Sequence, residues 1–173
     1  MKRFILRNSK RIVSGLFFVL LLLVCVLFSH DRITAASRGG YEILSYDCHY
    51  KVGEENVYHV TETIVVNFLE YRHGIYRYIP EVNYIRRLDG STDTIIDSID
   101  VTSCSDEYED YREGDSRMLK LGDPDEEIIG THVYVINYDV HWGNDRLEGA
   151  DEFYMNLVGD GWDVEIPNFT FTI

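Results

Sequence analysis

The fold is decided by the stretch Val57-Tyr-His-Val-Thr-Glu-Thr-Ile-Val-Val-Asn-Phe-Leu69, which continues as Glu70-Tyr-Arg-His-Gly-Ile-Tyr-Arg-Tyr-Ile-Pro80. In its first half, apolar side chains occupy every second position, which is the period of a half-buried β-strand. Those that share one face are Tyr58, Val60, Ile64, Val66 and Phe68. In its second half, His73 and Gly74 come shortly before the rigid Pro80, a combination that is typical of a bend. The stretch therefore predicts a core strand that ends in a bend.

One carboxylate interrupts this apolar face, because Glu62 falls at a position that points to the core. A buried carboxylate without a partner costs several kcal/mol, so it has to be neutralised or paired. Arg77 follows the bend, and its guanidinium can return to Glu62 as a two-point contact. We predict that the two form a structural ion pair that locks the bend; in the alternative, Glu62 lies near a sheet edge and is hydrated. A catalytic role for Glu62 is not indicated, since no second acid or nucleophile is spaced to serve it.

The N-terminus predicts export from the cytoplasm. Basic residues between Lys2 and Arg11 precede an uncharged, apolar run over residues 12–28, as in a signal peptide. As a helix, these 17 residues span about 26 Å, slightly less than the roughly 30 Å of a hydrocarbon core. A signal cleaved after Ala36 and a short retained membrane anchor therefore both remain open. Because the basic cluster comes first, we expect the N-terminus in the cytoplasm and the rest outside the membrane, or secreted if the signal is cleaved.

The exported part is strongly acidic. The whole chain carries a formal net charge of −14, and residues 1–36 hold six basic residues and one acid, so residues 37–173 keep ten basic and 29 acidic residues, a net charge of −19. Such a field repels nucleic acid and anionic lipid head groups, and neither is an expected ligand. A soluble acidic surface is the simplest explanation of this net charge. We predict two regions: residues 1–36 as signal peptide or N-terminal membrane anchor, and residues 37–173 as one exported domain.

The segment before the central stretch is its expected hairpin partner. Residues 41–52 predict a strand with Leu44, Tyr46, Cys48 and Tyr50 on one side, and residues 53–56 predict the turn. If the two apolar faces coincide, Cys48 lies opposite Glu62 and Leu44 lies opposite Val66.

The rest of the exported part is also dominated by strand patterns. Further strands are expected over residues 94–102, 118–121 and 131–142, and a bulged strand over residues 162–173. The acidic residues 105–115 are expected to form a solvated loop, Asp89-Gly90 a turn, and residues 151–158 a short helix. These elements predict a mainly β fold: an antiparallel β-sandwich preceded by one N-terminal apolar signal or anchor helix.

Six short motifs occur in an order that resembles a known family. They are Tyr-x-Ile-x-x-Tyr-Asp (41–47), Val-Thr-Glu-Thr-Ile (60–64), His-Gly-Ile-Tyr-Arg-x-Ile-Pro (73–80), Leu-Gly-Asp-Pro-Asp (121–125), Gly-x-His-x-Tyr-x-Ile-x-Tyr (130–138) and Asn-x-x-Gly-x-x-Trp-x-Val-x-Ile (156–166). The chain resembles the N-terminal exported domain of the predicted bacterial membrane proteins grouped as domain of unknown function 2207, the YciQ-like proteins. The resemblance implies a β-rich outer domain followed by further membrane helices and a cytoplasmic tail, with no established enzymatic activity. The sequence departs from this pattern in lacking the downstream helices, as a product truncated after that domain would, and in carrying Met155 where an aromatic residue is usual.

Two further candidate sites involve residues with other chemistry. Cys48 and Cys104 are both in the exported part, so either a disulfide or two separate buried thiols is compatible with the sequence. Asp123, Asp125 and Glu126 offer hard oxygen ligands for calcium, although acidic loops usually only solvate a surface. No metal site or cofactor is otherwise predicted, because His49 and His59 would be two ligands without a third.

The function expected from these observations is non-enzymatic. We expect an extracytoplasmic domain that acts in interaction or structural support at the cell envelope. Its partners would be the membrane, through the N-terminal segment, and an unnamed protein or envelope component. The alternative is a carbohydrate-binding or hydrolytic envelope domain, in which Tyr71, Tyr108 and Tyr111 would line a sugar platform.

Overall fold

The computed structural model describes residues 39–87, 90–142, 153–159 and 161–173. The predicted signal or anchor helix, Asp89 of the predicted turn and the start of the predicted helix at 151–158 lie outside these residues. Gly39–Ile173 form one compact unit. Across the ranges described, no helix is both long and apolar enough to cross a membrane.

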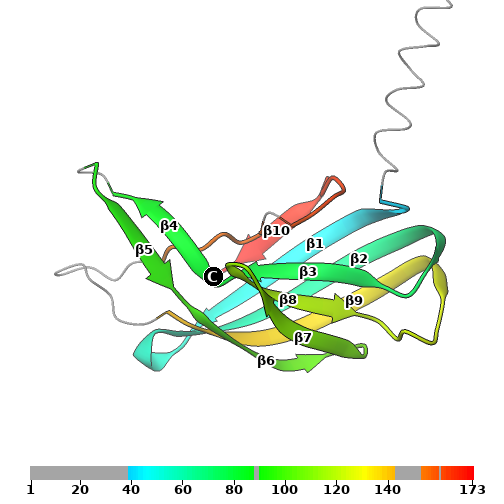
Figure 1. Ribbon diagram of the computed structural model, residues 1–173, viewed down its shortest axis with the longest axis horizontal. Helices are drawn as coiled ribbons and strands as arrows, with labels where there is room; N and C mark the ends of the chain where they lie inside the picture. The colour runs from blue at the N-terminus through cyan, green and yellow to red at the C-terminus, as the bar shows by residue number, and fades with distance from the viewer. Residues whose placement is uncertain (1–38, 88–89, 143–152, 160) are drawn as a thin grey trace, which may run out of the picture. The chain divides into compact units, whose positions relative to one another are not determined.

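The described residues are dominated by β-strands, so the predicted mainly β class is confirmed (Figure 1). The elements are β1 (Tyr41–Val52), the 3-10 turn η1 (Glu54–Asn56), β2 (Val57–Arg72), β3 (Ile75–Pro80), β4 (Val82–Arg86), β5 (Thr92–Ile96), β6 (Ser98–Cys104), β7 (Tyr108–Glu113), β8 (Ser116–Leu121), β9 (Ile128–His141) and β10 (Phe169–Thr172). They form a five-stranded sheet in the order β10-β1-β2-β9-β6, a three-stranded sheet β3-β8-β7 and a two-stranded sheet β4-β5. The neighbouring strands run antiparallel, with the exception of β10, which pairs with β1 in parallel.

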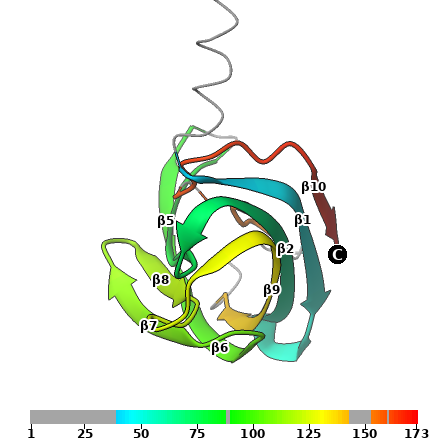
Figure 2. The same ribbon diagram turned by 90° about the vertical axis from the view of Figure 1, so that its right-hand side faces the viewer.

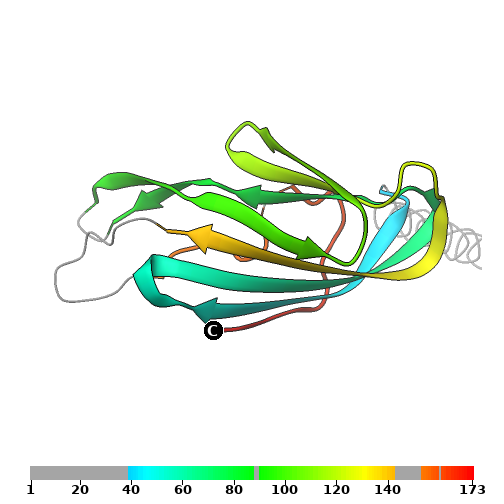
Figure 3. The ribbon, with the colours of Figure 1, turned by 90° about the horizontal axis from the view of Figure 1, so that it is seen from below.

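The five-stranded and three-stranded sheets share one core. In Figure 3, β3, β7 and β8 form a layer that faces β1, β2 and β9, and Figure 2 shows the same layers end-on. The buried side chains of β2 alternate with exposed or half-buried ones, as its sequence predicts, and they pack against Ile79, Leu119 and Leu121 of the opposite sheet. The C-terminal segment also contributes, because Trp162, Val164 and Ile166 pack against this core.

The register of β1 against β2 is largely as predicted. Cys48 lies opposite Glu62, as the alternation requires. Leu44 was expected opposite Val66, but a bulge between Ile43 and Ser45 shifts the strand by one position, so that Ile43 takes this place. Leu44 is therefore 41 % exposed, whereas Ile43 is buried. A single-residue bulge reverses the faces of a strand locally, and the alternation alone does not reveal it.

The acidic segment 105–115 was expected to be a solvated loop, but it contains strand β7. Its charges are compatible with a strand because basic residues of β8 oppose them: Glu109 pairs with Lys120 at 2.6 Å, and Asp110 forms an ion pair with Arg117. Cross-strand pairs of opposite charge stabilise a sheet.

Three other expectations about secondary structure are also corrected. Of the bulged strand expected over residues 162–173, only β10 forms a strand, and residues 162–168 are irregular or bent. The predicted strand over 94–102 is divided at Asp97 into β5 and β6, which belong to different sheets. Of the predicted helix, residues 153–158 are irregular or bent rather than helical. Phe153 and Leu157 are held there by packing against the core, which their helical spacing did not predict.

Candidate functional site

The bend after β2 brings two backbones into direct contact. Gly74 has φ +141°, and a Cβ at this position would overlap the carbonyl oxygen of Leu121. Gly122 has φ +120°, and a Cβ there would overlap the carbonyl oxygen of His73. Only glycine allows such an approach at positive φ. The bend is therefore fixed against the end of β8, and this sets the direction in which β3 starts.

Two residues along β3, Arg77 points into the core and meets Glu62. The Nε of Arg77 donates to Oε2 of Glu62 at 2.9 Å, and its Nη2 donates to Oε1 at 2.7 Å. The side chains are 1 % and 0 % exposed, respectively. Paired hydrogen bonds of this kind, between a planar guanidinium and a carboxylate, are strong and directional. The two residues of the predicted ion pair are thus brought together in the core and not at a hydrated sheet edge.

Tyr138, a backbone carbonyl and two aromatic rings also contact this ion pair. Tyr138 on β9 donates its hydroxyl hydrogen to Oε1 of Glu62 at 2.7 Å. The Nη1 of Arg77 donates to the carbonyl oxygen of Tyr78. The guanidinium carbon lies 5.7 Å from the ring centroid of Tyr46 and 5.7 Å from that of Trp162, and these two rings also contact each other edge to face. Cation–π contacts of this kind are strongest where water is excluded.

The electrostatics fix the protonation states of Arg77 and Tyr138 in this centre. Burial alone would lower the pKa of Arg77, but the charge and hydrogen bonds of Glu62, together with Tyr46 and Tyr138, raise it well above its usual value. Burial, followed by the charge of Glu62, raises the pKa of Tyr138 far above that of a free phenol. Arg77 therefore stays charged and Tyr138 stays neutral at any physiological pH.

Five of the six sequence motifs supply a side chain to this one centre. These side chains are Tyr46 (motif 41–47), Glu62 (60–64), Arg77 (73–80), Tyr138 (130–138) and Trp162 (156–166). The sixth motif, 121–125, contributes Leu121 and Gly122 to the backbone contact that fixes the bend. The motifs on which the family resemblance rests therefore assemble the core of the domain. Tyr46, Tyr138 and Trp162 were not predicted for this site, although each stands on an alternating apolar face that the sequence does reveal.

The two cysteines are too far apart to be joined. Along one row of the sheet, Cys48 lies opposite Glu62, Glu62 opposite Ile136, and Ile136 opposite Cys104. Three strand spacings put the two Cα atoms about 14 Å apart, whereas a disulfide needs less than about 7 Å. Both thiols are free, and the disulfide alternative is wrong in this structure. Burial, followed by the nearby charge of Glu62, raises the pKa of Cys48 to about 12, so that its thiol is neutral and unreactive.

In the acidic turn considered for calcium, a side-chain oxygen of Asp123 bonds to the chain's own backbone. The side-chain Oδ1 of Asp123 accepts a hydrogen bond from the amide of Asp125 at 2.7 Å, as in other turns capped by aspartate. Asp125 and Glu126 are exposed. Within the described part of the chain, Asp, Glu, His and Cys side chains do not gather in groups of three or more that could hold a metal ion.

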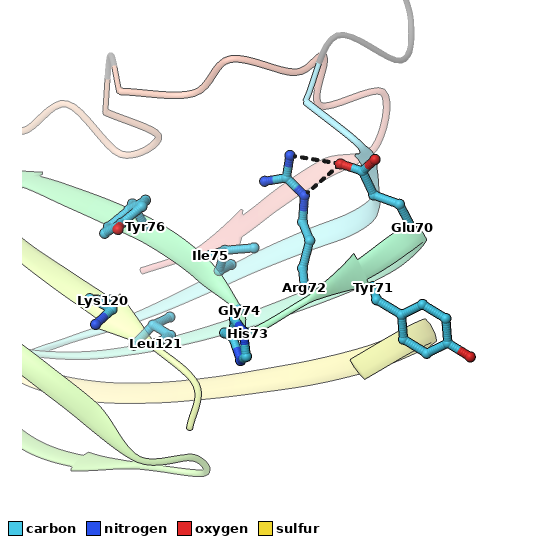
Figure 4. A pocket seen from close by; sticks show the side chains of 9 residues that line it. All are labelled: Glu70, Tyr71, Arg72, His73, Gly74, Ile75, Tyr76, Lys120 and Leu121. Carbon is cyan, nitrogen blue, oxygen red and sulfur yellow. Dashed lines mark hydrogen bonds and ion pairs between the residues drawn. The ribbon is translucent and has the colours of Figure 1, made fainter. Parts of the chain in front are cut away.

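A shallow pocket of about 360 Å³ lies at the bend, between the end of β2, the start of β3 and the end of β8 (Figure 4). Its carboxylate, that of Glu70, accepts a hydrogen bond from Nη2 of Arg72 at 3.1 Å. The ring of Tyr71 points away from Tyr76 and Lys120, which lie at the other side of the pocket (Figure 4). The predicted sugar platform is not assembled either: Tyr71 belongs to β2, and the register of β7 places Tyr108 and Tyr111 on opposite faces of the three-stranded sheet.

A cluster of polar and charged groups around Asp97 was not predicted from the sequence. Asp97 lies at the base of the β4–β5 hairpin and is only 3 % exposed. Its Oδ2 accepts a hydrogen bond from Nδ2 of Asn83 at 2.9 Å, and its backbone amide donates to the carbonyl oxygen of Glu81. Glu81 is also buried and forms an ion pair with Arg112 at 2.6 Å. Burial, with a further contribution from the charge of Glu81, raises the pKa of Asp97 to about 7. The only sign of this cluster in the sequence is that Asp97 stands between two short apolar segments.

Comparison with known proteins identifies the family to which the chain belongs. No curated protein matches the chain. A family model described as the N-terminal domain of predicted membrane proteins (DUF2207) matches residues 42–173, which include every residue of the Glu62–Arg77 centre. Because this match covers most of the chain, the protein belongs to the DUF2207 family of predicted membrane proteins, whose N-terminal domain has no known function.

Proposed function

We propose that residues 37–173 form a non-enzymatic extracytoplasmic β-sandwich domain that acts in interaction or structural support at the cell envelope. The N-terminal segment would hold the domain at the membrane, with the N-terminus in the cytoplasm, or would release it if the signal is cleaved. Membership of a family of predicted membrane proteins supports this placement, as does the order of a basic cluster, an apolar run and a strongly acidic domain.

The observation that carries the proposal is the closure of the Glu62–Arg77 centre. An enzyme needs an acid, base or nucleophile that can reach a substrate. Glu62 is the carboxylate that the family motifs place in the core, and both of its oxygens accept hydrogen bonds from the protein itself. Its charge therefore holds β2, β3 and β9 together, which is what a stable scaffold for surface contacts requires.

An activity screen tests the non-enzymatic part. The purified chain and its Glu62→Gln variant would be assayed with chromogenic ester, phosphate and glycoside substrates. We expect both proteins to be inactive. Turnover by the wild-type chain that Glu62→Gln abolishes without loss of folding would overturn the proposal in favour of the hydrolytic alternative.

Chemical labelling of intact cells tests the placement. A Tyr71→Cys variant in a Cys25→Ser/Cys104→Ser background presents a thiol at a site that is 65 % exposed as tyrosine. Cys48 is buried and stays silent. We expect a membrane-impermeant maleimide to label this variant without permeabilisation. Labelling only after permeabilisation would place the domain in the cytoplasm.

A further inference from the structure

The outer face of the three-stranded sheet carries three tyrosines around one methionine. In the register of β3, β8 and β7, Tyr78 lies opposite Met118, and Met118 lies opposite Tyr111. Tyr76 precedes Tyr78 by two residues and therefore shares its face. We call this surface the tyrosine face; its members are Tyr76, Tyr78, Tyr111 and Met118, flanked by Glu109, Glu113 and Lys120.

Met118 provides a buried apolar support beneath the rings of this face. The adjacent Leu119 belongs to the shared core, so Met118 points the other way, toward the outside of the sheet. It is nevertheless only 2 % exposed. Its cover has to come from the outer side, where Tyr78 and Tyr111 are its direct cross-strand neighbours. The rings thus rest on a fixed apolar support while Tyr76 and Tyr111 remain 51 % and 42 % exposed.

Carboxylates border these rings. Partial burial, followed by the charge of Glu113 and by the neighbouring Tyr111 and Tyr76, raises the pKa of Tyr78. The phenol of Tyr78 therefore stays neutral at physiological pH, and Glu113 lies close enough to affect it. On the other side, Glu109 is neutralised by Lys120, whose pKa the hydrogen bond to Glu109 raises. A cationic side chain of a partner could therefore form a new ion pair with Glu113.

We infer that the tyrosine face docks a basic polypeptide segment, rich in arginine or lysine, of a partner protein. This inference rests on the proposed function, because it names the partner of an interaction domain. Tyrosine rings attract cations, most of all arginine, and a nearby carboxylate adds a charge-assisted hydrogen bond. The same contacts already occur within the domain, where the guanidinium carbon of Arg77 lies 5.7 Å from two ring centroids and that of Arg72 lies 5.6 Å from the ring centroid of Tyr41.

Charge selects the class of partner. The exported part has a net charge of −19, which attracts a cationic segment and repels anionic polymers. An uncharged glycan would gain no long-range attraction from this field and could form no ion pair with Glu113. Rigid tyrosines lose little conformational entropy on binding, so a small supported cluster is sufficient as the centre of an interface.

Binding of defined probes to the full chain in detergent tests the inference. The probes are a peptide with arginine at alternate positions, the same peptide with glutamate in place of each arginine, and cellohexaose as a neutral glycan. We expect only the arginine peptide to bind, with an affinity that falls as salt is raised. The double variant Tyr76→Ser/Tyr111→Ser should weaken it about tenfold. The matched control Tyr71→Ser, which alters an exposed tyrosine outside this face, should change it less than about twofold.

Glu113→Gln keeps the test decisive if the double variant is unstable, since it changes a charge at an exposed site. This variant should lower the affinity and flatten the salt dependence. Equal binding of both peptides, or equal loss in Tyr71→Ser and in the face variants, would overturn the inference. Binding of cellohexaose alone would overturn it as well, but would leave a non-enzymatic interaction domain in place. Only the activity screen and the labelling experiment described above can overturn that proposed function.

Discussion

Gly159 lies so close to Arg77 that a Cβ at this position would come within 2.7 Å of Nη1 and within 2.8 Å of the carbonyl oxygen of Tyr78. The residue thereby lets the C-terminal segment close over the buried ion pair, and it places Trp162 three residues later on the guanidinium. Its φ of +77° is also one that side chains with a Cβ rarely adopt.

Gly159→Ala is therefore expected to lower the free energy of unfolding by about 2–4 kcal/mol, through backbone strain and overpacking together. Gly114→Ala is the matched control, because Gly114 also has a positive φ, +59°, but would place its Cβ in open space. We expect it to cost only about 1 kcal/mol. Urea denaturation of the two variants measures the difference. Equal losses would show that the packing against Arg77 contributes nothing.

A double-mutant cycle measures the coupling between Glu62 and Arg77. Removing one member leaves a buried charge without a partner, and we expect Glu62→Gln and Arg77→Ala each to cost about 3–5 kcal/mol. The double variant should lose clearly less than the sum of the two single losses, because it leaves no unpaired charge. Denaturant unfolding of all four proteins gives these values. Fully additive losses would mean that the two residues do not stabilise the fold as a pair.

Asp97 predicts a dependence of stability on pH. Its pKa is about 7 in the folded chain, against about 4 when unfolded. The folded chain therefore keeps a proton that the unfolded chain releases, so that stability falls as the pH rises from about 4 to 7. Asp97→Asn cannot ionise. We expect it to raise the melting temperature at pH 8, with a gain that shrinks steadily toward pH 4.

The size of this effect follows from the difference between the folded and unfolded pKa values of Asp97, since a difference of one corresponds to about 1.4 kcal/mol in the free energy of unfolding. Asp125→Asn, at an exposed carboxylate, is the control and should leave the pH profile unchanged. Calorimetric scans between pH 4 and 8 provide the measurement. A constant difference between Asp97→Asn and the wild type across this range would rule out titration of Asp97.

The thiols offer a further check of the register. In a Cys25→Ser background, we expect Cys48 to resist a thiol reagent at pH 8 until the protein unfolds, because it is buried with a pKa of about 12. Cys104 is half-buried and should react first. Mass spectrometry after timed labelling distinguishes the two sites. A protein that forms an internal disulfide on mild oxidation without unfolding would contradict the row that separates Cys48 from Cys104.

Much of the fold could be predicted because the alternation of apolar residues is a local signal. It places Tyr58, Val60 and Ile64 on the core face and brings Cys48 opposite Glu62, as the structure shows. The same argument puts Glu62 in the core, where an unpaired charge is too costly, and so it points to the nearest arginine after the bend.

What could not be predicted depends on groups that meet only in three dimensions. The bulge beside Leu44 leaves no mark in the alternation, and the charges of β7 indicate a loop unless their partners on β8 are known. The contribution of Trp162 to the ion pair depends on a segment far along the chain that contacts Arg77 and Tyr78 of β3. The burial of Asp97 likewise depends on Glu81 and Asn83, which approach it only when the hairpin folds.

The parallel pairing of β10 with β1 has a mechanical consequence. The pairs Tyr46–Phe169 to His49–Thr172 join the first and the last strand of the domain side by side, and both strands run in the same direction. A pull applied between Tyr41 and Ile173 would therefore act along these strands in opposite senses and load their evenly spaced hydrogen bonds together, in shear, instead of opening them one after another. The domain is thus arranged to carry tension between its two ends.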